Sequence, residues 1–357
     1  MKSLSAIARE MGVSPATVSY VYHGKWRENR IRPEVAERVR EKLEAEGAAP
    51  DALGSQLRSG RTQTVGVLLP HLEQAYFLKL LAGIEARLAE SGHMLFLGIA
   101  HSDREVRQVS LVERMLARRV DAVLMAPRPA SDLDVFLAAM RRRSKTPLVF
   151  VDNYLAQIRA GRATSDNRWG ARQAVRDMLR AGRRRIAFFG WDPSVAALWD
   201  RFEGYCDALK AEGLPRSRPL TIWRHEREEE ALDALRELLR HPRHRPDAIF
   251  ATSFLHFLPA LKVMDDLGLR HPDDVLLAGF DEPVETWAED TVRRVIRQPL
   301  WAVIQRAGEI GRAAVELVLA AIGGKNISAA HAMVRPDLSW RKDTKARQTQ
   351  KRERIRQ

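Results

Sequence analysis

The stretch Gly12-Val-Ser-Pro-Ala-Thr-Val-Ser-Tyr20 decides how the beginning of the chain folds. Ser14 is a residue type that accepts a backbone N–H at a helix N-cap, and Pro15 fits the first helical position, where no N–H is needed. Val13 can pack on Val18 across the first turn. The pattern therefore predicts a helix that begins at Pro15.

A second amphipathic pattern lies upstream of this helix. Its apolar residues recur at i, i+3, i+4 and i+7, as on one face of a helix: Leu4, Ile7, Ala8 and Met11. Gly12 follows directly, and glycine is the residue type that most often ends helices. Two short helices joined at a glycine-containing turn are typical of the helix-turn-helix arrangement. In that arrangement the second helix lies in the DNA major groove and the first helix braces it.

The expected second helix has an inward and an outward face. Val18, Val21 and Tyr22 are spaced to pack inward. The other side chains point outward or cap the helix, and they are the candidates for contacts with bases and phosphates: Ser14, Pro15, Ala16, Thr17, Ser19 and Tyr20. A pattern this short also occurs in ordinary capped helices, so a purely structural helix remains an alternative at this point.

The segments that follow favour a helix-turn-helix over a purely structural helix. A third helix is expected from Pro33, because Val35, Val39 and Leu43 recur at a spacing of four and Gly47 follows. Next come Pro50-Asp-Ala-Leu-Gly-Ser-Gln-Leu-Arg-Ser-Gly60 and an apolar strand, Thr64-Val-Gly-Val-Leu-Leu-Pro70.

With this order of segments, the sequence resembles the lactose/galactose-repressor (LacI/GalR) family of bacterial transcription regulators, from about residue 3 to about residue 342. The resemblance implies a small all-α helix-turn-helix head and an α/β core that is similar to periplasmic binding proteins. Such a core consists of two parallel-sheet subdomains with a ligand cleft between them. Four segments are then expected: a DNA-binding head at 1–48, a hinge at 49–62, an effector-binding and dimerisation core at 63–340, and a basic, disordered tail at 341–357.

The hinge of this family becomes helical only on operator DNA, where a leucine enters the minor groove and kinks the duplex. By this resemblance Leu57 is the wedge, a role that apolar side chains fill in other minor-groove binders. Gly54 is the second DNA-contacting residue expected in the hinge. It stands where the family usually has alanine, which makes the hinge costlier to fold. A linker leucine that packs on its own domain is the alternative for Leu57.

Charge is distributed unevenly along the 357 residues, which include 59 Lys and Arg against 46 Asp and Glu. Residues 1–62 hold 11 basic and 8 acidic residues and residues 335–357 hold 9 and 3, which leaves 39 and 35 between them. The excess therefore lies at the ends, as expected of modules that contact phosphates. A solubility bias in an arginine-rich protein is the alternative explanation.

Several classes of protein are excluded. The single cysteine, Cys206, rules out an internal disulfide and a cysteine-based zinc site. Because no segment resembles a signal peptide and no run approaches 18 apolar residues, we expect a cytoplasmic protein without a membrane partner. The motifs of phosphate-loop, dinucleotide and zinc-protease chemistry are absent, and the histidines lack metal-ligand spacing. We therefore expect no enzymatic activity, no metal and no cofactor.

From Thr64 onward, strands and helices are expected to alternate, which favours parallel sheets. The expected strands are 65–69, 94–99, 122–126, 148–151, 186–189, 248–251 and 275–278. The helical patterns between them include 77–90, 106–118, 171–181 and 258–267, and the resemblance places dimer contacts on the last.

Ligands of open parallel sheets bind beyond the carboxyl ends of the strands. At such positions the resemblance implies these effector-binding residues: Tyr76, Phe77, Asp152, Arg201, Phe254, Asp281 and Gln298. Carboxylate and guanidinium groups suit this role, because each can hold two sugar hydroxyls at once. An ordinary helix cap or surface pair is the alternative for each of them.

The sequence departs from the family pattern at two places. Ser253-Phe254 replaces a frequent Asn-Asp pair, and the segment 195–199 is apolar where polar residues often precede the pocket arginine. The cleft should then be less polar than a monosaccharide site, so a larger glycoside, another metabolite or no ligand all stay open. Tyr20 stands where arginine or asparagine is common, so the operator preference should depart from the family consensus.

These observations predict a homodimeric, sequence-specific DNA-binding regulator, a repressor whose partners are double-stranded operator DNA and a small-molecule effector, a sugar or glycoside. The alternative is a cytoplasmic small-molecule-binding protein with the same type of core and no DNA role.

Overall fold

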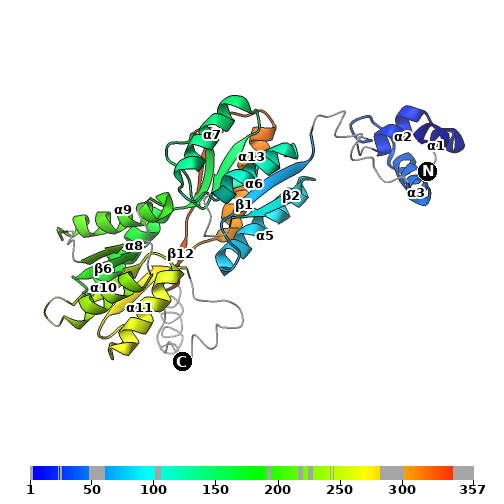
Figure 1. Ribbon diagram of the computed structural model, residues 1–357. Coiled ribbons are helices and arrows are strands. Elements are labelled where there is room, and N and C mark those ends of the chain that lie inside the picture. The colour runs from blue at the N-terminus through cyan, green and yellow to red at the C-terminus, as the bar shows by residue number, and fades with distance from the viewer. Residues whose placement is uncertain are drawn as a thin grey trace, which may run out of the picture. The chain divides into compact units, whose positions relative to one another are not determined.

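The computed structural model describes residues 3–22, 24, 26–47, 61–100, 106–190, 194–215, 220–223, 228–241, 243, 245–281 and 301–340 (Figure 1). The chain divides into two compact units, Met1–Gln63 and Thr64–Gln357. The expected hinge contacts, Gly54 and Leu57, and the expected tail at 341–357 lie outside the described residues.

The first unit contains the three helices that the sequence predicts: α1 (Leu4–Met11), α2 (Pro15–Tyr22) and α3 (Pro33–Ala45). Gly12 ends α1 in the left-handed conformation, with φ of 65°. The hydroxyl oxygen of Ser14 accepts the backbone N–H of Thr17 at 3.0 Å, which caps the start of α2. The three helices share one small core: Ile7, Ala8, Val18, Val21, Tyr22, Ala36, Val39 and Leu43.

The second unit contains two six-stranded sheets. The strands of the first sheet are β1 (Thr64–Leu69), β2 (Met94–Ile99), β3 (Ala122–Met125), β4 (Leu148–Val151), β5 (Gly161–Ser165) and β11 (His331–Val334). They lie in the order β11-β5-β4-β3-β1-β2, and every pair is parallel. Helices α5 (Ala75–Glu90) and α13 (Ala307–Ile322) cover one face, and α6 (Val106–Ala117) and α7 (Ser131–Arg143) cover the other.

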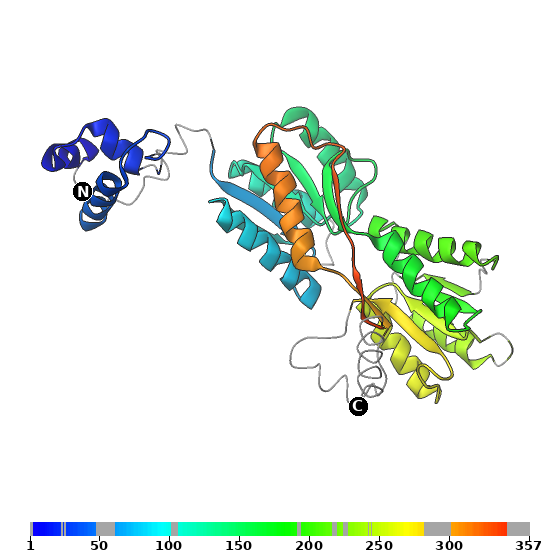
Figure 2. The ribbon, with the colours of Figure 1, turned by 180° about the vertical axis from the view of Figure 1, so that it is seen from behind.

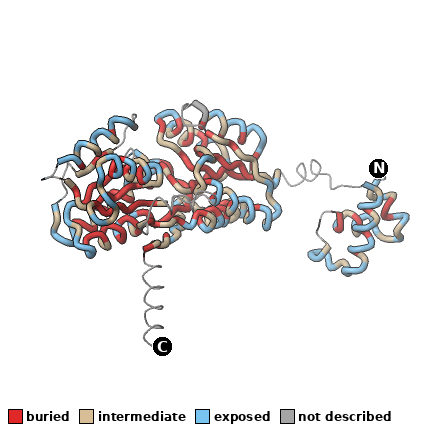
Figure 3. Tube along the Cα trace, turned by 90° about the horizontal axis from the view of Figure 1, so that it is seen from below, coloured by how far each residue is buried: buried red, intermediate tan, exposed pale blue. Residues whose placement is uncertain are grey.

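The second sheet repeats this plan. Its strands are β6 (Ile186–Gly190), β7 (Thr221–Trp223), β8 (Ala248–Ala251), β9 (Leu276–Phe280), β10 (Trp301–Ile304) and β12 (Asp337–Leu338). Their order is β12-β10-β9-β8-β6-β7, and only the pairing of β10 with β12 is antiparallel. Helices α8 (Asn167–Arg180) and α9 (Ala196–Ala211) cover one face, and α10 (Glu228–Arg240) and α11 (Phe254–Asp266) cover the other. Figure 3 shows the strands of both sheets as buried layers between more exposed helices.

Because the two strand orders correspond position by position, β4 of the first sheet is equivalent to β9 of the second. The chain crosses between the sheets three times: after β5, after β10 and after β11. Figure 2 shows α13 returning to the first sheet and the last crossing running back to the second.

Helices α5 and α13 pack unusually closely, and glycine makes this possible. A Cβ atom added to Gly83 would lie 2.7 Å from Gly308 Cα, a separation that real Cβ atoms do not adopt. A Cβ atom added to Gly308 would lie 3.7 Å from its nearest neighbour, the Lys79 carbonyl oxygen, which is an ordinary contact.

We therefore expect Gly83→Ala to lower the free energy of unfolding by about 2–3 kcal/mol, because the helices must separate. Gly308→Ala should be neutral or stabilise by less than about 1 kcal/mol, since alanine favours helix. Urea denaturation of both variants measures the difference. Equal effects of the two substitutions would contradict this description of the packing.

Each of the seven expected strands is present, with ends shifted by at most two residues, and the expected helices begin up to four residues earlier than predicted. Five strands were not predicted: β5, β7, β10, β11 and β12. Among the described residues, no helix is both long and apolar enough to cross a membrane.

Candidate functional site

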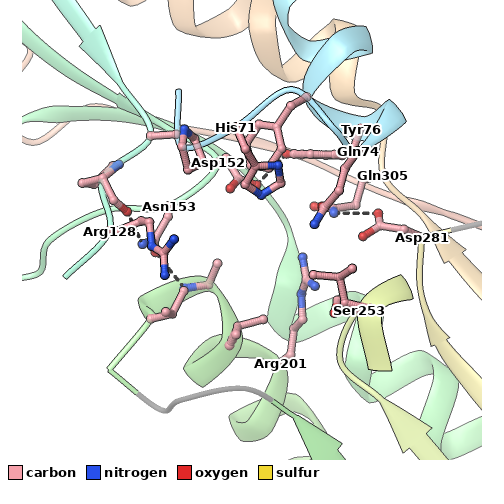
Figure 4. Close-up of a pocket in the computed structure, with 18 residues that line it drawn as sticks. His71, Gln74, Tyr76, Arg128, Asp152, Asn153, Arg201, Ser253, Asp281 and Gln305 are labelled. Carbon is pink, nitrogen blue, oxygen red and sulfur yellow. Dashed lines mark hydrogen bonds between the residues drawn. The ribbon is translucent and has the colours of Figure 1, made fainter. Parts of the chain in front are cut away.

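A cavity of about 200 Å³ lies between the carboxyl ends of the two sheets (Figure 4). The first sheet contributes residues that follow β1, β3 and β4, and the second contributes residues of α9 and residues that follow β8, β9 and β10. The position agrees with the rule that open parallel sheets bind ligands at this edge. Of the seven expected effector-binding residues, five line the cavity: Tyr76, Phe77, Asp152, Arg201 and Asp281.

Asp152 and Tyr76 form a hydrogen-bonded pair on the side of the first sheet. The Tyr76 hydroxyl donates to Asp152 Oδ1 at 2.6 Å. Burial raises the pKa of Asp152 from its ordinary 3.8 to about 6, although the bond from Tyr76 and the charge of Arg201 act in the opposite direction. At neutral pH this carboxylate is ionised, and its second oxygen has no partner among the described residues.

Asp281 occupies the equivalent position on the second sheet, since it follows β9 as Asp152 follows β4. It accepts a hydrogen bond from Gln305 Nε2 at 2.8 Å, and burial raises its pKa. Both aspartates adopt the left-handed backbone region, with φ of 67° at Asp152 and 66° at Asp281. Such conformations are uncommon for residues with a side chain and concentrate at functional sites. The repeated plan of the two sheets thus places two matched carboxylates across one cavity.

Arg201 lies opposite on α9 and is only 4% exposed. Its Nε donates to Asn167 Oδ1 at 2.8 Å and its Nη1 donates to the carbonyl oxygen of Thr252. The guanidinium carbon lies 3.8 Å from the centre of the Phe280 ring. Burial lowers the pKa of Arg201, and the carboxylates of Asp281 and Asp152 oppose this shift.

These contacts hold the guanidinium rigidly and leave one nitrogen for a ligand. Within the described part of the chain, Nη2 of Arg201 forms no hydrogen bond. Figure 4 shows the guanidinium pointing into the cavity, toward the side where Asp281 and Gln305 lie. A guanidinium stays charged even when buried, so Arg201 can donate a charge-assisted hydrogen bond.

Ser253, from the Ser253-Phe254 pair that the sequence relates to the cleft, also lines the cavity. Other polar lining residues were not predicted from the sequence: His71, Gln74, Arg128, Asn153 and Gln305. Asn153 links the subdomains, because its Nδ2 donates to the Pro127 carbonyl oxygen at 2.7 Å and its Oδ1 accepts the backbone N–H of Ala197 at 3.2 Å. Burial lowers the pKa of His71, which keeps the imidazole neutral at pH 7. The rule that loops after strands line ligand sites would have selected His71 and Arg128.

One expected effector-binding residue, Phe254, does not line the cavity. Phe254 is the first residue of α11 and packs against the apolar core on that face of the second sheet, while its neighbours Ser253 and Leu255 line the cavity. Successive helical residues point about 100° apart, so Phe254 turns away from the cavity. Gln298 lies outside the described residues.

The apolar part of the lining agrees with the expectation of a less polar cleft. Val195, Ala197 and Leu198 form one wall, and Phe77 packs edge-on against His71 with ring centres 4.7 Å apart. The cavity therefore offers both hydrogen-bonding groups and apolar surface, which suits a polyhydroxylated ligand with an apolar face. Among the described residues, no group of three or more His, Cys, Asp or Glu side chains could hold a metal ion.

The candidate DNA-contacting residues form a second, separate set on α2. Ser14, Pro15, Ala16 and Tyr20 are exposed, and Thr17 and Ser19 are half-buried. The hydroxyls of Ser14 and Thr17 lie 2.8 Å apart and bond to each other, so both also serve the cap of the helix.

Comparison with known proteins identifies relatives along nearly the whole chain. Residues 62–353 match the family model described as periplasmic binding proteins and sugar binding domain of LacI family. Catabolite control protein A of Priestia megaterium is 25% identical over 342 residues, which cover 95% of this chain and 98% of that protein. The HTH-type transcriptional regulator CelR of Thermobifida fusca is 28% identical over 331 residues, which cover 90% and 92%.

Solved structures agree with this match. The transcriptional regulator CelR–cellobiose complex superimposes with a TM-score of 0.67 at 26% identity and covers 95% of this chain and 98% of that chain. A putative ribose operon repressor from Burkholderia thailandensis has a TM-score of 0.67 at 24% identity over 78% of this chain and 99% of that chain. The second likeness concerns the fold alone.

Proposed function

Because the chain belongs to the LacI family, we propose that it is a sequence-specific DNA-binding repressor controlled by a sugar or glycoside bound between its two sheets. The observation that carries the proposal is the polar set in the cavity: two matched carboxylates, Asp152 and Asp281, and the buried guanidinium of Arg201. Adjacent hydroxyls on a sugar ring can donate to the carboxylates and accept from the guanidinium.

The ligand class follows from the rest of the lining. Tyr76, Phe77 and the apolar wall of Val195, Ala197 and Leu198 offer surface for the apolar face of a sugar ring or for a second ring. A relative with a similar fold is known as a complex with cellobiose, a glycoside, which supports the same class here.

On the DNA side, we propose that α2 lies in the major groove and that its outward side chains contact the operator. Two chains would present two such helices, so a homodimer would read a near-palindromic site. In the same proposal, the hinge at 49–62 carries Leu57 into the minor groove. The name of one relative, an HTH-type transcriptional regulator, supports this role for the head.

Ligand binding would act on DNA binding through the arrangement of the two subdomains. The cavity is lined from both sheets, so a ligand that contacts both favours one relative orientation over others. To change DNA affinity, the ligand must bind the DNA-competent and DNA-incompetent arrangements unequally.

The test of the ligand class is thermal unfolding of the full-length protein with a panel of sugars that includes cellobiose, ribose and phosphorylated sugars. A ligand present at 100 times its Kd stabilises the folded form by about 2.7 kcal/mol, which raises the Tm by several degrees. Absence of any shift across mono- and disaccharides, with a cooperative transition present, would contradict a sugar effector.

Acid should weaken ligand binding through Asp152. Protonation removes the acceptor that a ligand hydroxyl needs, so we expect affinity to fall as pH drops below about 6, approaching tenfold per pH unit. Titration calorimetry of the wild type and Asp152→Asn between pH 8 and pH 4.5 measures this. The variant should bind more weakly at pH 8 and lose the part of the pH dependence that Asp152 causes. Parallel curves would contradict the role of Asp152.

The contribution of Asp152 to folding stability should change with pH in the direction opposite to ligand affinity. The folded-state pKa of Asp152 lies above 3.8, so the folded form binds the proton more tightly than the unfolded chain. The contribution of this group to stability therefore falls as pH rises from about 4 to about 6, and it is constant above that range.

A further inference from the structure

A cluster of positive side chains lies on the first sheet of the core, at the edge remote from the cavity. We call it the basic rim: Arg141, Arg142, Arg143, Lys145 and Lys325. The three arginines form the last turn of α7, Lys145 follows two residues later, and Lys325 lies three residues beyond the end of α13. All five side chains are exposed.

Three of the five members of the basic rim line a common hollow. A cavity of about 310 Å³ is lined by Arg141, Lys145 and Lys325 together with the polar residues Ser144, Thr146, Asn326 and Ser328. Because α7 and α13 cover opposite faces of the sheet, the hollow lies at the sheet edge between their ends. It therefore combines cationic groups with hydroxyl and amide donors, as sites for phosphate oxygens do.

The internal contacts of the protein do not account for the basic rim. Within the residues that the structure describes, none of its five members forms a hydrogen bond or ion pair through its side chain. At the corresponding edge of the second sheet, in contrast, arginine side chains bond within the protein. Arg183 donates to the Pro272 carbonyl oxygen at 2.6 Å, and Arg184 donates to the Leu179 carbonyl oxygen at 2.8 Å. Arg270 pairs with Asp274.

Two general explanations of the basic rim, helix-dipole compensation and the charge of the core, are also insufficient. One or two cations at a helix C-terminus complement the helix dipole, but a run of like charges is self-repulsive. The charge balance of the core is not the cause either, since residues 63–334 hold 39 basic and 35 acidic residues. The positive charge is thus concentrated at this edge and not typical of the core as a whole.

The place of the basic rim in the chain suggests its partner. The strands of this sheet are parallel, so β1, β4 and β5 all begin at the same edge. The chain enters the core at Thr64, the first residue of β1, and α13 ends at the same edge (Figure 2). The segment that connects the head to this edge, residues 48–63, can span at most about 55 Å.

We propose that the basic rim binds the phosphate backbone of duplex DNA that flanks the operator. The inference rests on the proposed function, since it needs a head that holds a duplex within reach of this edge. Neutralising phosphates releases condensed counterions, so the contacts would add affinity without sequence preference. The basic rim is then a second DNA-contacting surface, separate from α2.

The test compares two duplexes that share one site selected from a random library by the full-length protein. One duplex ends at the site, and the other carries about 20 base pairs, or about 68 Å, on each side. The rim variant is R141Q/R142Q/R143Q/K145Q. The control variant, R172Q/K210Q/R240Q/R243Q, neutralises four exposed cations of the second sheet's subdomain and leaves α11, the helix expected to carry dimer contacts, unchanged.

We expect wild type and control to bind the long duplex about tenfold or more tightly than the short one at 50 mM salt. The rim variant should bind the short duplex within about twofold of wild type and bind the long duplex little more tightly. For the rim variant, the slope of log K for DNA binding against log salt concentration should be less steep than for wild type. The difference should be about 0.9 for each phosphate that the variant no longer neutralises. Unchanged melting temperatures verify that the variants fold.

Other outcomes overturn the proposal in distinguishable ways. If wild type binds both duplexes equally, or if the control variant is weakened as much as the rim variant, the basic rim is a solvated face. If the library yields no preferred duplex at all, the proposed function fails, and the basic rim fails with it.

Discussion

Arg201→Met is expected to abolish sugar binding and to lower the free energy of unfolding by about 3–5 kcal/mol. The guanidinium is buried and bonds to Asn167 Oδ1 and the Thr252 carbonyl oxygen. Methionine fills similar space but leaves both acceptors unpaired. It also removes the positive charge that opposes protonation of Asp152 and Asp281. Ligand affinity should fall at least 100-fold, because the substitution removes a charge-assisted bond and also the charge that keeps the two carboxylates ionised.

The matched control is Arg168→Met, since Arg168 also donates two side-chain hydrogen bonds, both to the carboxylate of Asp207, at 2.7 Å and 3.0 Å. This pair is exposed, so its removal should cost less than about 1 kcal/mol and leave ligand binding unchanged. Urea denaturation and calorimetry measure both quantities. Arg201→Lys keeps the charge without the forked geometry and provides a second, better-folded variant. Wild-type ligand affinity in both Arg201 variants would refute the role of Arg201.

Deletion of residues 1–61 is expected to lower affinity for a selected operator by at least about 10³-fold, the usual difference between specific and nonspecific binding. The head has its own core, formed by α1, α2 and α3, and separates as a compact unit from the residues that follow Gln63. The truncated core should therefore keep its ligand affinity and melting temperature. Equal DNA affinity of the truncated and full-length chains would favour a small-molecule-binding protein without a DNA role.

A single substitution tests the same helix in the full-length chain. Ala16→Asp adds a negative charge at an exposed position of α2, which should repel phosphates and lower operator affinity at least tenfold. Ala45→Asp adds the same charge at an exposed position of α3 and is the control. Equal reductions of affinity in both variants would argue against α2 as the DNA-contacting element.

The alternating pattern of the core could be predicted where strands are apolar on both faces. The residues of β4 are Leu-Val-Phe-Val and those of β8 are Ala-Ile-Phe-Ala, and each strand is fully buried. In contrast, β5 reads Gly-Arg-Ala-Thr-Ser, and β12 has two residues. Such strands are determined by pairing with distant segments, β5 with β4 and β11, and the local sequence carries little signal of that pairing.

The candidate site, like the fold, could be predicted where its residues follow strands that the sequence reveals. Asp152 and Asp281 end recognisable strands, and the carboxyl-end rule together with the family resemblance placed both at the cavity. Gln305 was not predicted because it follows β10, a strand that the sequence pattern does not reveal. The prediction for Gln298 is untested, since that residue lies outside the described residues. Phe254 was placed in the cavity although the rotation of α11 directs it to the core. Helix starting points, and hence side-chain directions, depend on tertiary packing that the sequence pattern does not contain.

The most direct measurement is selection of binding sites from a random duplex library by the purified full-length protein, repeated with the sugar that raises its melting temperature. We expect enrichment of a near-palindromic site and a change of at least about fivefold in its Kd when the sugar is present. No enrichment over random competitor, with or without sugar, would contradict the claim that this chain is a ligand-controlled DNA-binding regulator.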